Sequence, residues 1–228
     1  MMVNASYQPE TPTWCGPEPP ELSTGTTLVA MEFADGVVMG ADSRTSDDSF
    51  YSSVTDRFAD KLTPVTSHIM TCSSGLTADA QAMTEIVKNQ LEWYEIEFEN
   101  PPSVHTAAHI FKNISYDGQL TAELIIAGWD KDNGGQVYSV PIRGALMRQA
   151  ASIVGSGSTF LYGFIDANYK QNMKKDECVE LAKKAVTLAI NRDGSSGGCC
   201  RIAIITKDGI ERKLFLNNEL DAIDKVSY

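Results

Sequence analysis

Residues 24–45 read TGTTLVAMEFADGVVMGADSRT, and this stretch decides the class of fold. The run from Thr26 to Phe33 is apolar and β-branched, which favours a strand. Asp35-Gly36 is a dipeptide typical of a hairpin turn. A second apolar run follows over Val37–Asp42. The stretch therefore predicts two antiparallel strands, the second of which ends in charged residues.

The rest of the chain alternates pairs of helices with groups of strands. Apolar residues spaced three and four apart predict a helix over Ala80–Phe98, and Pro101-Pro102 stops it. The other expected elements are helices at Ser103–Tyr116, Thr159–Asn168 and Lys175–Arg192, and strands at Val65–Cys72, Glu123–Asp130, Gln136–Pro141, Ala145–Val154, Cys199–Thr206 and Ile210–Leu216. This order predicts a one-domain α+β fold, with two antiparallel sheets packed face to face and a helix pair outside each.

The composition excludes several classes of function. Of the 228 residues 43% are apolar and 21% charged, as in a globular protein with a sizeable core. The net charge of −11 argues against a nucleic-acid binder and against a basic membrane-surface protein. No apolar stretch approaches the ~18 residues of a membrane span. Five cysteines without CxxC spacing favour free thiols in a reducing compartment, and three scattered histidines are too few for a metal site.

The first 25 residues differ from the rest. They hold five of the nine prolines, three glutamates and no Lys or Arg. Proline at this density prevents a regular helix or a central strand. The segment also lacks the basic region and the continuous apolar core of a secretory signal. We interpret it as an extended leader, although composition alone favours a merely disordered terminus.

Four local features could carry chemistry. They are Ser23–Thr27, Gly40–Arg44, Asp60–Leu62, and a pair of small-residue loops at Gly155–Ser158 and Asp193–Gly198. Each has a simpler interpretation. Gly/Ser loops are usually tight turns, and Asp42 beside Arg44 could be a surface ion pair worth little. Gly-rich loops before helices also bind phosphate, but the acidic chain and the lack of Lys in these loops argue against that.

Taken together, the features indicate a threonine nucleophile. A threonine hydroxyl is a weak nucleophile that needs an adjacent base. If the chain is cut after Gly25, Thr26 becomes the amino terminus, and its α-amino group, with an unperturbed pKa of about 7.7–8.0, is such a base. The small Gly25 would let the chain bend for attack by the Thr26 hydroxyl on the preceding carbonyl. A buried Lys held by an Asp would favour the deprotonated hydroxyl, and Asp42 and Lys61 are candidates.

These motifs resemble those of the N-terminal nucleophile hydrolases and, more narrowly, of the β subunits of the 20S proteasome. The resemblance runs from about Ser23 to Glu211. Its motifs occur in order as TGTT (24–27), GADSRT (40–45), DKLTP (60–64), SG (74–75), IIAGWD (125–130), GGQVYSVP (134–141), GSGS (155–158) and DGSSGG (193–198). The last four are most similar to the caspase-like β subunits of eukaryotes.

The resemblance implies a four-layer αββα sandwich and an organisation in two parts. Residues 1–25 would be a propeptide removed by self-cleavage between Gly25 and Thr26, and residues 26–228 the catalytic domain. The implied partners are the other β subunits of a heteroheptameric ring, the α-subunit ring and unfolded polypeptide substrates. The implied location is the cytoplasm and the nucleus. No metal or cofactor is needed for the implied chemistry.

Carried over position by position, the resemblance assigns a role to each site residue. Thr26 would be the nucleophile and its free amine the proton acceptor, with Asp42 and Lys61 as the charge pair beside it. The backbone N–H of Gly75 would stabilise the oxyanion. The residues expected to hold the Thr26 amine and the site waters are Ser156, Asp193 and Ser196. The residues expected to contact substrate are Thr45, Ala59, Ser73 and Thr77.

Two departures from the family pattern concern specificity. The segment 45–59, TSDDSFYSSVTDRFA, is a few residues longer than usual. Ser73 stands at the position where the family members that cleave after acidic residues are similar in having an arginine. Burying a substrate carboxylate there without a cation costs several kcal/mol, so we expect a preference for neutral residues before the scissile bond. Arg57, or a residue from a neighbouring subunit, is the alternative source of a cation.

Two other functions compete with an active endopeptidase. One is a structural ring subunit that keeps its leader and has no activity. Non-catalytic relatives generally lack the Thr/Asp/Lys set, whereas Thr26, Asp42 and Lys61 are all in place here. The other is a stand-alone hydrolase of the same nucleophile class, such as an amidase. Co-purification with α-type subunits in a large ring would argue against that alternative.

Overall fold

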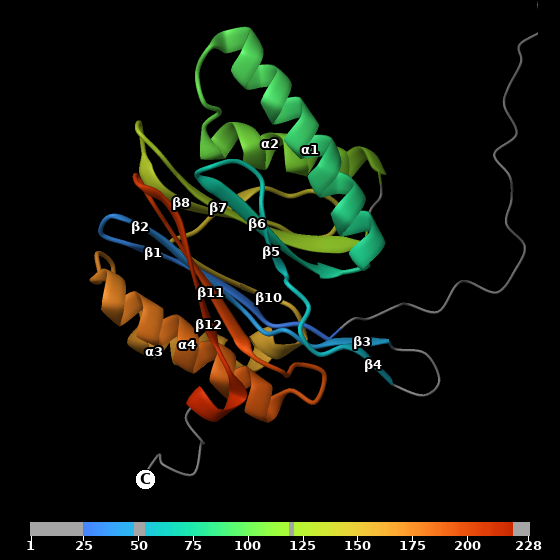
Figure 1. Cartoon of the computed structure of the whole chain (residues 1–228), viewed down its shortest axis with the longest axis vertical. Helices are drawn as coiled ribbons and strands as arrows, with labels where there is room; N and C mark the ends of the chain where they lie inside the picture. Colours follow the sequence, from blue (N-terminus) through green and yellow to red (C-terminus); the bar gives the residue numbers. More distant parts are fainter. Residues whose placement is uncertain (1–24, 48–52, 119–120, 221–228) are drawn as a thin grey trace, which may run out of the picture.

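Two five-stranded antiparallel sheets pack face to face between two layers of helices (Figure 1). The computed structural model describes residues 25–47, 53–118 and 121–220. One sheet has the strand order β10-β1-β2-β11-β12 and the other the order β5-β6-β7-β8-β9. The α+β sandwich expected from the sequence is therefore confirmed. None of the helices in the described part of the chain is long and apolar enough to cross a membrane.

The first sheet contains the predicted hairpin. Its strands are β1 (Leu28–Phe33), β2 (Gly36–Ala41), β10 (Ala151–Val154), β11 (Cys200–Thr206) and β12 (Gly209–Phe215). In the hairpin, Leu28 lies opposite Ala41 and Phe33 opposite Gly36. Both faces of β1 and β2 are covered, one by the second sheet and one by helices, which explains their near-continuous apolar sequence.

The second sheet continues the antiparallel pattern. Its strands are β5 (Leu62–Pro64), β6 (Ile69–Gly75), β7 (Ala122–Asp130), β8 (Gly134–Val140) and β9 (Met147–Arg148). A separate hairpin of β3 (Thr45–Asp47) and β4 (Ser53–Asp56) lies within the lengthened segment. Neither this hairpin nor β5 was predicted, because strands of three or four residues show too little alternation to be recognised.

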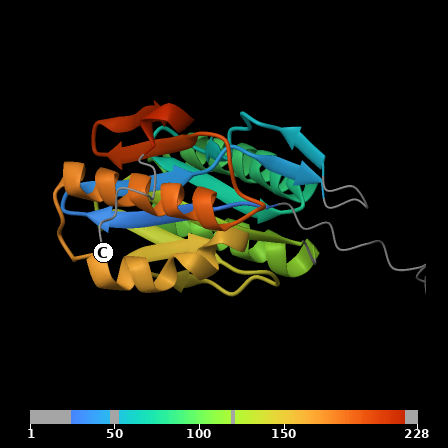
Figure 2. The ribbon, with the colours of Figure 1, turned by 90° about the horizontal axis from the view of Figure 1, so that it is seen from below.

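A pair of helices covers the outer face of each sheet. Helices α1 (Thr77–Phe98) and α2 (Val104–Gly118) pack on the second sheet, and α3 (Tyr162–Asn168) and α4 (Lys175–Arg192) pack on the first (Figure 2). Short 3-10 turns occur at η1 (Ser156–Phe160) and η2 (Asn217–Glu219). Between the sheets lies a third apolar layer that includes Leu28, Met39 and Ile125. The site described below lies at the open end of this layer.

Three predicted elements differ from the structure. The strand expected at Val65–Cys72 begins only at Ile69, and the helix expected at Thr159–Asn168 is divided between η1 and α3. The third difference is larger. Ala145–Val154 was expected to be a single strand, but it forms β9 and β10, which belong to different sheets. β9 pairs with β8, whereas β10 pairs with β1. The two residues between them bond to different strands, because Gln149 donates its N–H to Val137 and Ala150 accepts from Glu32. The chain thus crosses from one sheet to the other within residues 147–154, with no glycine or proline to mark the change.

Candidate active site

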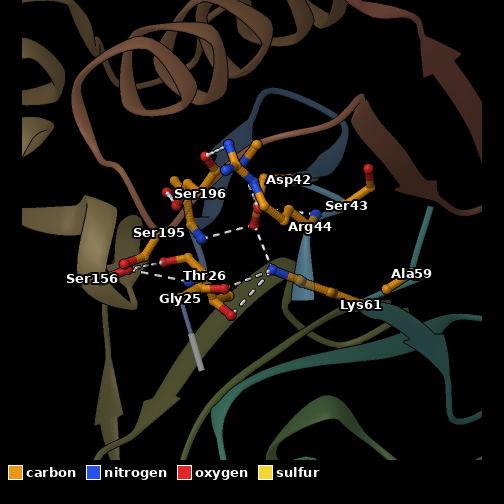
Figure 3. A network of polar contacts seen from close by, with 12 residues as sticks. Gly25, Thr26, Asp42, Ser43, Arg44, Ala59, Lys61, Ser156, Ser195 and Ser196 are labelled. Carbon is orange, nitrogen blue, oxygen red and sulfur yellow. Dashed lines mark hydrogen bonds and ion pairs between the residues drawn. The ribbon is translucent and has the colours of Figure 1, made fainter. Parts of the chain in front are cut away.

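Three side chains predicted to act together meet at the start of β1. Thr26 precedes β1, Asp42 follows β2, and Lys61 precedes β5. The Lys61 Nζ donates to Asp42 Oδ1 at 2.7 Å, to Thr26 Oγ1 at 3.1 Å and to the Gly25 carbonyl oxygen at 3.2 Å (Figure 3). An ammonium group has three N–H donors, so each donor of Lys61 has its own acceptor.

The carboxylate of Asp42 is fully buried and fully hydrogen-bonded. The hairpin register brings it beside Thr27, whose N–H donates to Oδ1 at 2.9 Å. Its other oxygen, Oδ2, accepts the N–H groups of Gly197 at 3.0 Å and Arg44 at 3.2 Å. With Lys61, four donors surround the two oxygens, which offsets the cost of burying this charge. Asp42 is therefore held rigidly, and it holds Lys61 against the threonine.

Two opposing effects act on the charge of Lys61. Burial lowers the pKa of Lys61 below its ordinary value, and the attraction of Asp42 offsets only part of this effect. Only 9% of the Lys61 side chain is exposed, whereas Asp42 is completely covered. A lysine with a lowered pKa exchanges a proton with a neighbouring hydroxyl more readily than a surface lysine does.

A second group of predicted residues holds the nitrogen of Thr26. The Thr26 N–H donates to Ser156 Oγ at 3.1 Å. Ser156 in turn donates to Asp193 Oδ2 at 2.7 Å, and Ser196 donates to the same oxygen at 2.6 Å. Partial burial alone would raise the pKa of Asp193, but the hydrogen bonds it accepts lower the pKa overall. Asp193 is therefore an anion that orders two hydroxyl groups beside Thr26.

The two Gly/Ser loops thus form one network, although 37 residues separate Ser156 from Asp193. The first loop ends β10 and begins η1, and Asp193 directly follows α4. Gly155 has φ of +95°, and a Cβ there would lie 2.2 Å from the Thr26 carbonyl oxygen. Only glycine allows the loop to approach the threonine so closely.

A cavity of about 780 Å³ opens beside Thr26 and Lys61. It is lined by β6, by the first turns of α1 and by the residues around β5. All four residues expected to contact substrate line this cavity, together with Gly75, which has φ of +108°. They are Thr45, Ala59, Ser73 and Thr77. The hydroxyl of Thr26 therefore faces a space that can hold a side chain.

Comparison with known proteins identifies the family. The family described as "Proteasome subunit" matches residues 22–205. The chain is 47% identical over 197 residues to "Probable proteasome subunit beta type-1" of Schizosaccharomyces pombe, covering 86% of each chain. It is 48% identical over 202 residues to "Proteasome subunit beta type-9" of Rattus norvegicus, covering 88% of this chain and 90% of that one. It is 42% identical over 201 residues to "Proteasome subunit beta type-6" of Dictyostelium discoideum, covering 87% and 92%.

The chain is a proteasome β subunit. As a member of this family it assembles with other proteasome subunits. The interpretation of Asp42 and Arg44 as a surface ion pair is wrong, because Asp42 is buried and its ionic partner is Lys61.

Sequence reasoning missed two residues of this β subunit's site. The Arg44 guanidinium donates to the carbonyl oxygens of Ser196 at 2.5 Å and Gly194 at 3.4 Å, and so holds the loop after α4. The Thr27 hydroxyl bonds to Ser196 Oγ at 2.7 Å. Both residues lie inside motifs recognised from the sequence, but their own contacts join segments about 150 or more residues apart. Spacing along the chain carries no signal for such contacts.

Proposed function

We propose that this β subunit is a threonine endopeptidase, with Thr26 as nucleophile after self-cleavage between Gly25 and Thr26. One observation carries the proposal: the Lys61 ammonium touches both the Thr26 hydroxyl and the Gly25 carbonyl oxygen. These atoms are the attacking group and the acceptor of negative charge in an attack on the preceding peptide bond. A cation held at both places favours that reaction and disfavours a purely structural role.

Self-cleavage then proceeds in two steps. The Thr26 Oγ attacks the carbonyl carbon of Gly25, and the hydroxyl proton passes to the Thr26 nitrogen as the C–N bond breaks. The product is an ester between Gly25 and the Thr26 oxygen, with a free amine on Thr26. Water hydrolyses the ester and leaves a carboxylate on Gly25 and a free hydroxyl on Thr26. Lys61 stabilises the negative charge that develops on the Gly25 oxygen.

The local geometry around Gly25 favours this bond as the site of cleavage. A Cβ at position 25 would lie 2.1 Å from the Cβ of Ser195 and 2.3 Å from its carbonyl oxygen. Any larger residue would push the carbonyl away from Lys61. Thr26 is 3% exposed, so its hydroxyl is shielded from bulk water while the chain is uncut.

Hydrolysis of a substrate repeats the same chemistry with an external peptide bond. The free amine of Thr26, which Ser156 and Asp193 hold, accepts the hydroxyl proton as the oxygen attacks. The proton passes to the leaving amine, and the acyl group remains as an ester on Thr26. Water then releases the acyl group as a carboxylate. We assign stabilisation of the oxyanion to the Gly75 N–H, which the resemblance to the family suggests.

The charges around the cavity favour substrates with a neutral side chain before the scissile bond. After Gly25 has left, Lys61 still donates to Asp42 and to the Thr26 hydroxyl, and its third donor points to where the Gly25 carbonyl oxygen stood, which is the place of the scissile carbonyl and not of the side chain before it. Arg57 lines a different cavity, together with Phe58 and Leu216. The remaining cation of the lining, Lys88, lies eleven residues beyond Thr77 on α1, about 16 Å along the helix axis.

The rest of the lining is neutral or acidic. Its hydroxyl residues include Thr63, Thr71 and Ser73, and its carboxylates include Asp56 and Glu85. An acidic side chain that enters beside Ser73 would lose water without gaining a cation. We therefore propose that this β subunit cleaves after neutral residues and discriminates against Glu and Asp.

The proposal is tested on the assembled particle with the other active subunits silenced. Sequencing the mature chain should give Thr26 as its first residue. An epoxyketone inhibitor should form an adduct on Thr26 through both its hydroxyl and its amine. A Thr26→Ala particle should assemble, keep residues 1–25 and form no adduct. A chain that keeps its leader in the mature wild-type particle would instead indicate a structural subunit without activity.

A further inference from the structure

The Thr27 hydroxyl lies at the centre of the polar network although neither the motifs nor the proposed mechanism uses it. Thr27 is completely buried. Its Oγ1 lies 2.7 Å from Ser196 Oγ. The space for this hydroxyl exists because residue 157 is glycine, since a Cβ there would lie 1.9 Å from Thr27 Oγ1. A buried hydroxyl enclosed in this way has a single fixed orientation.

The direction of the Thr27–Ser196 hydrogen bond follows from the protons available. Ser196 has one hydroxyl proton, and it donates this proton to Asp193 Oδ2 at 2.6 Å. Asp193 is an anion with a lowered pKa, so it has no proton to donate in return. Thr27 must therefore be the donor and Ser196 the acceptor. A hydroxyl that accepts a hydrogen bond becomes a stronger donor, so Thr27 strengthens the bond from Ser196 to Asp193.

The backbone of Thr27 is tied to the other half of the site. Its N–H donates to Asp42 Oδ1 at 2.9 Å, and its carbonyl oxygen accepts the N–H of Asp42 at 3.2 Å. Thr27 is thus bonded both to the carboxylate that holds Lys61 and to the hydroxyl that orders Asp193. Arg44 also bonds to Asp42 and to Ser196, but it reaches Ser196 through the carbonyl oxygen, whereas Thr27 reaches the Ser196 hydroxyl itself.

We infer that Thr27 is a positioning residue, whose hydroxyl keeps the amine of Thr26 on Ser156 and the hydroxyl of Thr26 on Lys61. The inference rests on the proposed function. Once the leader is removed, Thr26 has one covalent neighbour, and that neighbour is Thr27. Any rotation of Thr27 would therefore displace the amine and the hydroxyl of Thr26 together. Hydrogen bonds at both ends of Thr27 prevent that rotation.

The test replaces the hydroxyl and keeps the shape. In Thr27→Val, a methyl group replaces the hydroxyl, so Ser196 loses the donor that orients it. In Thr27→Ser, the hydroxyl remains. The activity of assembled particles is measured with the other active subunits silenced, and kcat is expressed per Thr26 that accepts an epoxyketone. This normalisation removes chains that failed to mature.

We expect T27V to lower kcat roughly ten-fold and to leave KM within about two-fold, because the substrate cavity is unchanged. T27S should recover kcat to within about three-fold of the wild type. The matched control is Thr187→Val, which removes a buried hydroxyl that bonds to the Lys183 carbonyl inside α4. The control should leave both constants unchanged.

Three results would overturn the inference: a T27V kcat within two-fold of the wild type, a T27S kcat as low as that of T27V, or an equal loss in T187V. If T27V fails to assemble, Thr27→Cys takes its place, because its thiol is a weaker donor. The kcat of T27C should then lie well below that of T27S, and equal values would overturn the inference. The wild-type adduct on Thr26 tests the proposed function separately, so the two failures are distinguishable.

Discussion

At the scale of single residues, the site depends on complete pairing of buried charges. Asp42 accepts four hydrogen bonds, and Lys61 donates three. A buried ion pair is costly to break, because the remaining partner is left charged without compensation. The pair therefore has two separable effects, one on the chemistry of Thr26 and one on the stability of the fold.

Changing Lys61 to Ala should abolish both leader removal and peptide hydrolysis. The variant loses the cation at the Gly25 oxygen and leaves Asp42 buried without its partner, at a cost of about 3–5 kcal/mol. Intact mass gives leader retention, and a peptide substrate gives hydrolysis. The control is Lys175→Ala, which breaks an exposed pair with Glu211 and should cost at most about 1 kcal/mol. A K61A particle that cleaves its peptide normally would contradict the assignment.

Asp193 should make the stability of the subunit depend on acid pH. Its pKa is lowered in the folded state, so its contribution to stability is fully present above the unfolded value of about 3.9. The contribution is lost as the pH falls through the lower folded value. The difference in unfolding midpoint between the wild type and Asp193→Asn should therefore be constant near neutrality and shrink below about pH 4. Urea unfolding, monitored by far-ultraviolet circular dichroism at each pH, measures this difference. A difference that grows on acidification would refute the prediction.

At the scale of elements, the turn between β10 and η1 sets the position of the nucleophile. In Gly155→Ala, the new Cβ would lie 2.2 Å from the Thr26 carbonyl oxygen, and the φ of +95° is strained for alanine. A displacement of about 1 Å at a reacting group can cost 10²-fold in rate, so we expect a loss of that size in peptide hydrolysis.

The matched control for this turn is Gly163→Ala in α3, where a Cβ would meet no atom within 4 Å. Alanine is the better helix former by up to about 1 kcal/mol, so this variant should be as stable as the wild type or more stable, with unchanged hydrolysis. Equal activity of G155A and G163A would show that the turn does not position Thr26.

The elements also show which parts of the structure the sequence could predict. The β1–β2 hairpin and helix α4 were predicted to within about two residues, because apolar periodicity and turn residues are local signals. The split between β9 and β10 was missed, because the choice of sheet depends on partners far along the chain. Thr26, Asp42 and Lys61 were predicted together, because a threonine nucleophile needs a hydroxyl group and a buried Lys–Asp pair beside it. Thr27 and Arg44 were not, because their roles depend on contacts with the loop around Ser196.

At the scale of the whole molecule, the substrate cavity brings together segments that the sequence separates widely. Its walls come from β6, from one face of α1 and from the chain between β4 and β5. No single segment fixes the charge of the cavity. The balance arises because the fold turns Arg57 toward another cavity and places Lys88 about three turns along α1 from Thr77. The preference for a substrate side chain therefore depends on how β6, α1 and the chain between β4 and β5 come together around the cavity.

Introducing a cation at Ser73 should reverse the preference of this β subunit. In Ser73→Arg, a guanidinium would stand beside Gly75 and could pair with a substrate carboxylate through two hydrogen bonds. Matched peptides ending in Glu, Leu and Tyr are compared with the other active subunits silenced. The wild type should favour Leu and Tyr, and S73R should shift the Glu-to-Leu ratio of kcat/KM by roughly 10²–10³.

The control for this reversal is Lys88→Ala, which removes the remaining cation of the cavity wall and should leave the ratio unchanged. If the wild type instead cleaves after Glu ten-fold faster than after Leu, a cation already reaches the pocket. A loss of that preference in K88A would identify Lys88 as its source. Among the described residues that line this cavity, the other cation is Lys61, which is paired with Asp42. If K88A kept the preference, the cation would therefore have to come from a neighbouring subunit.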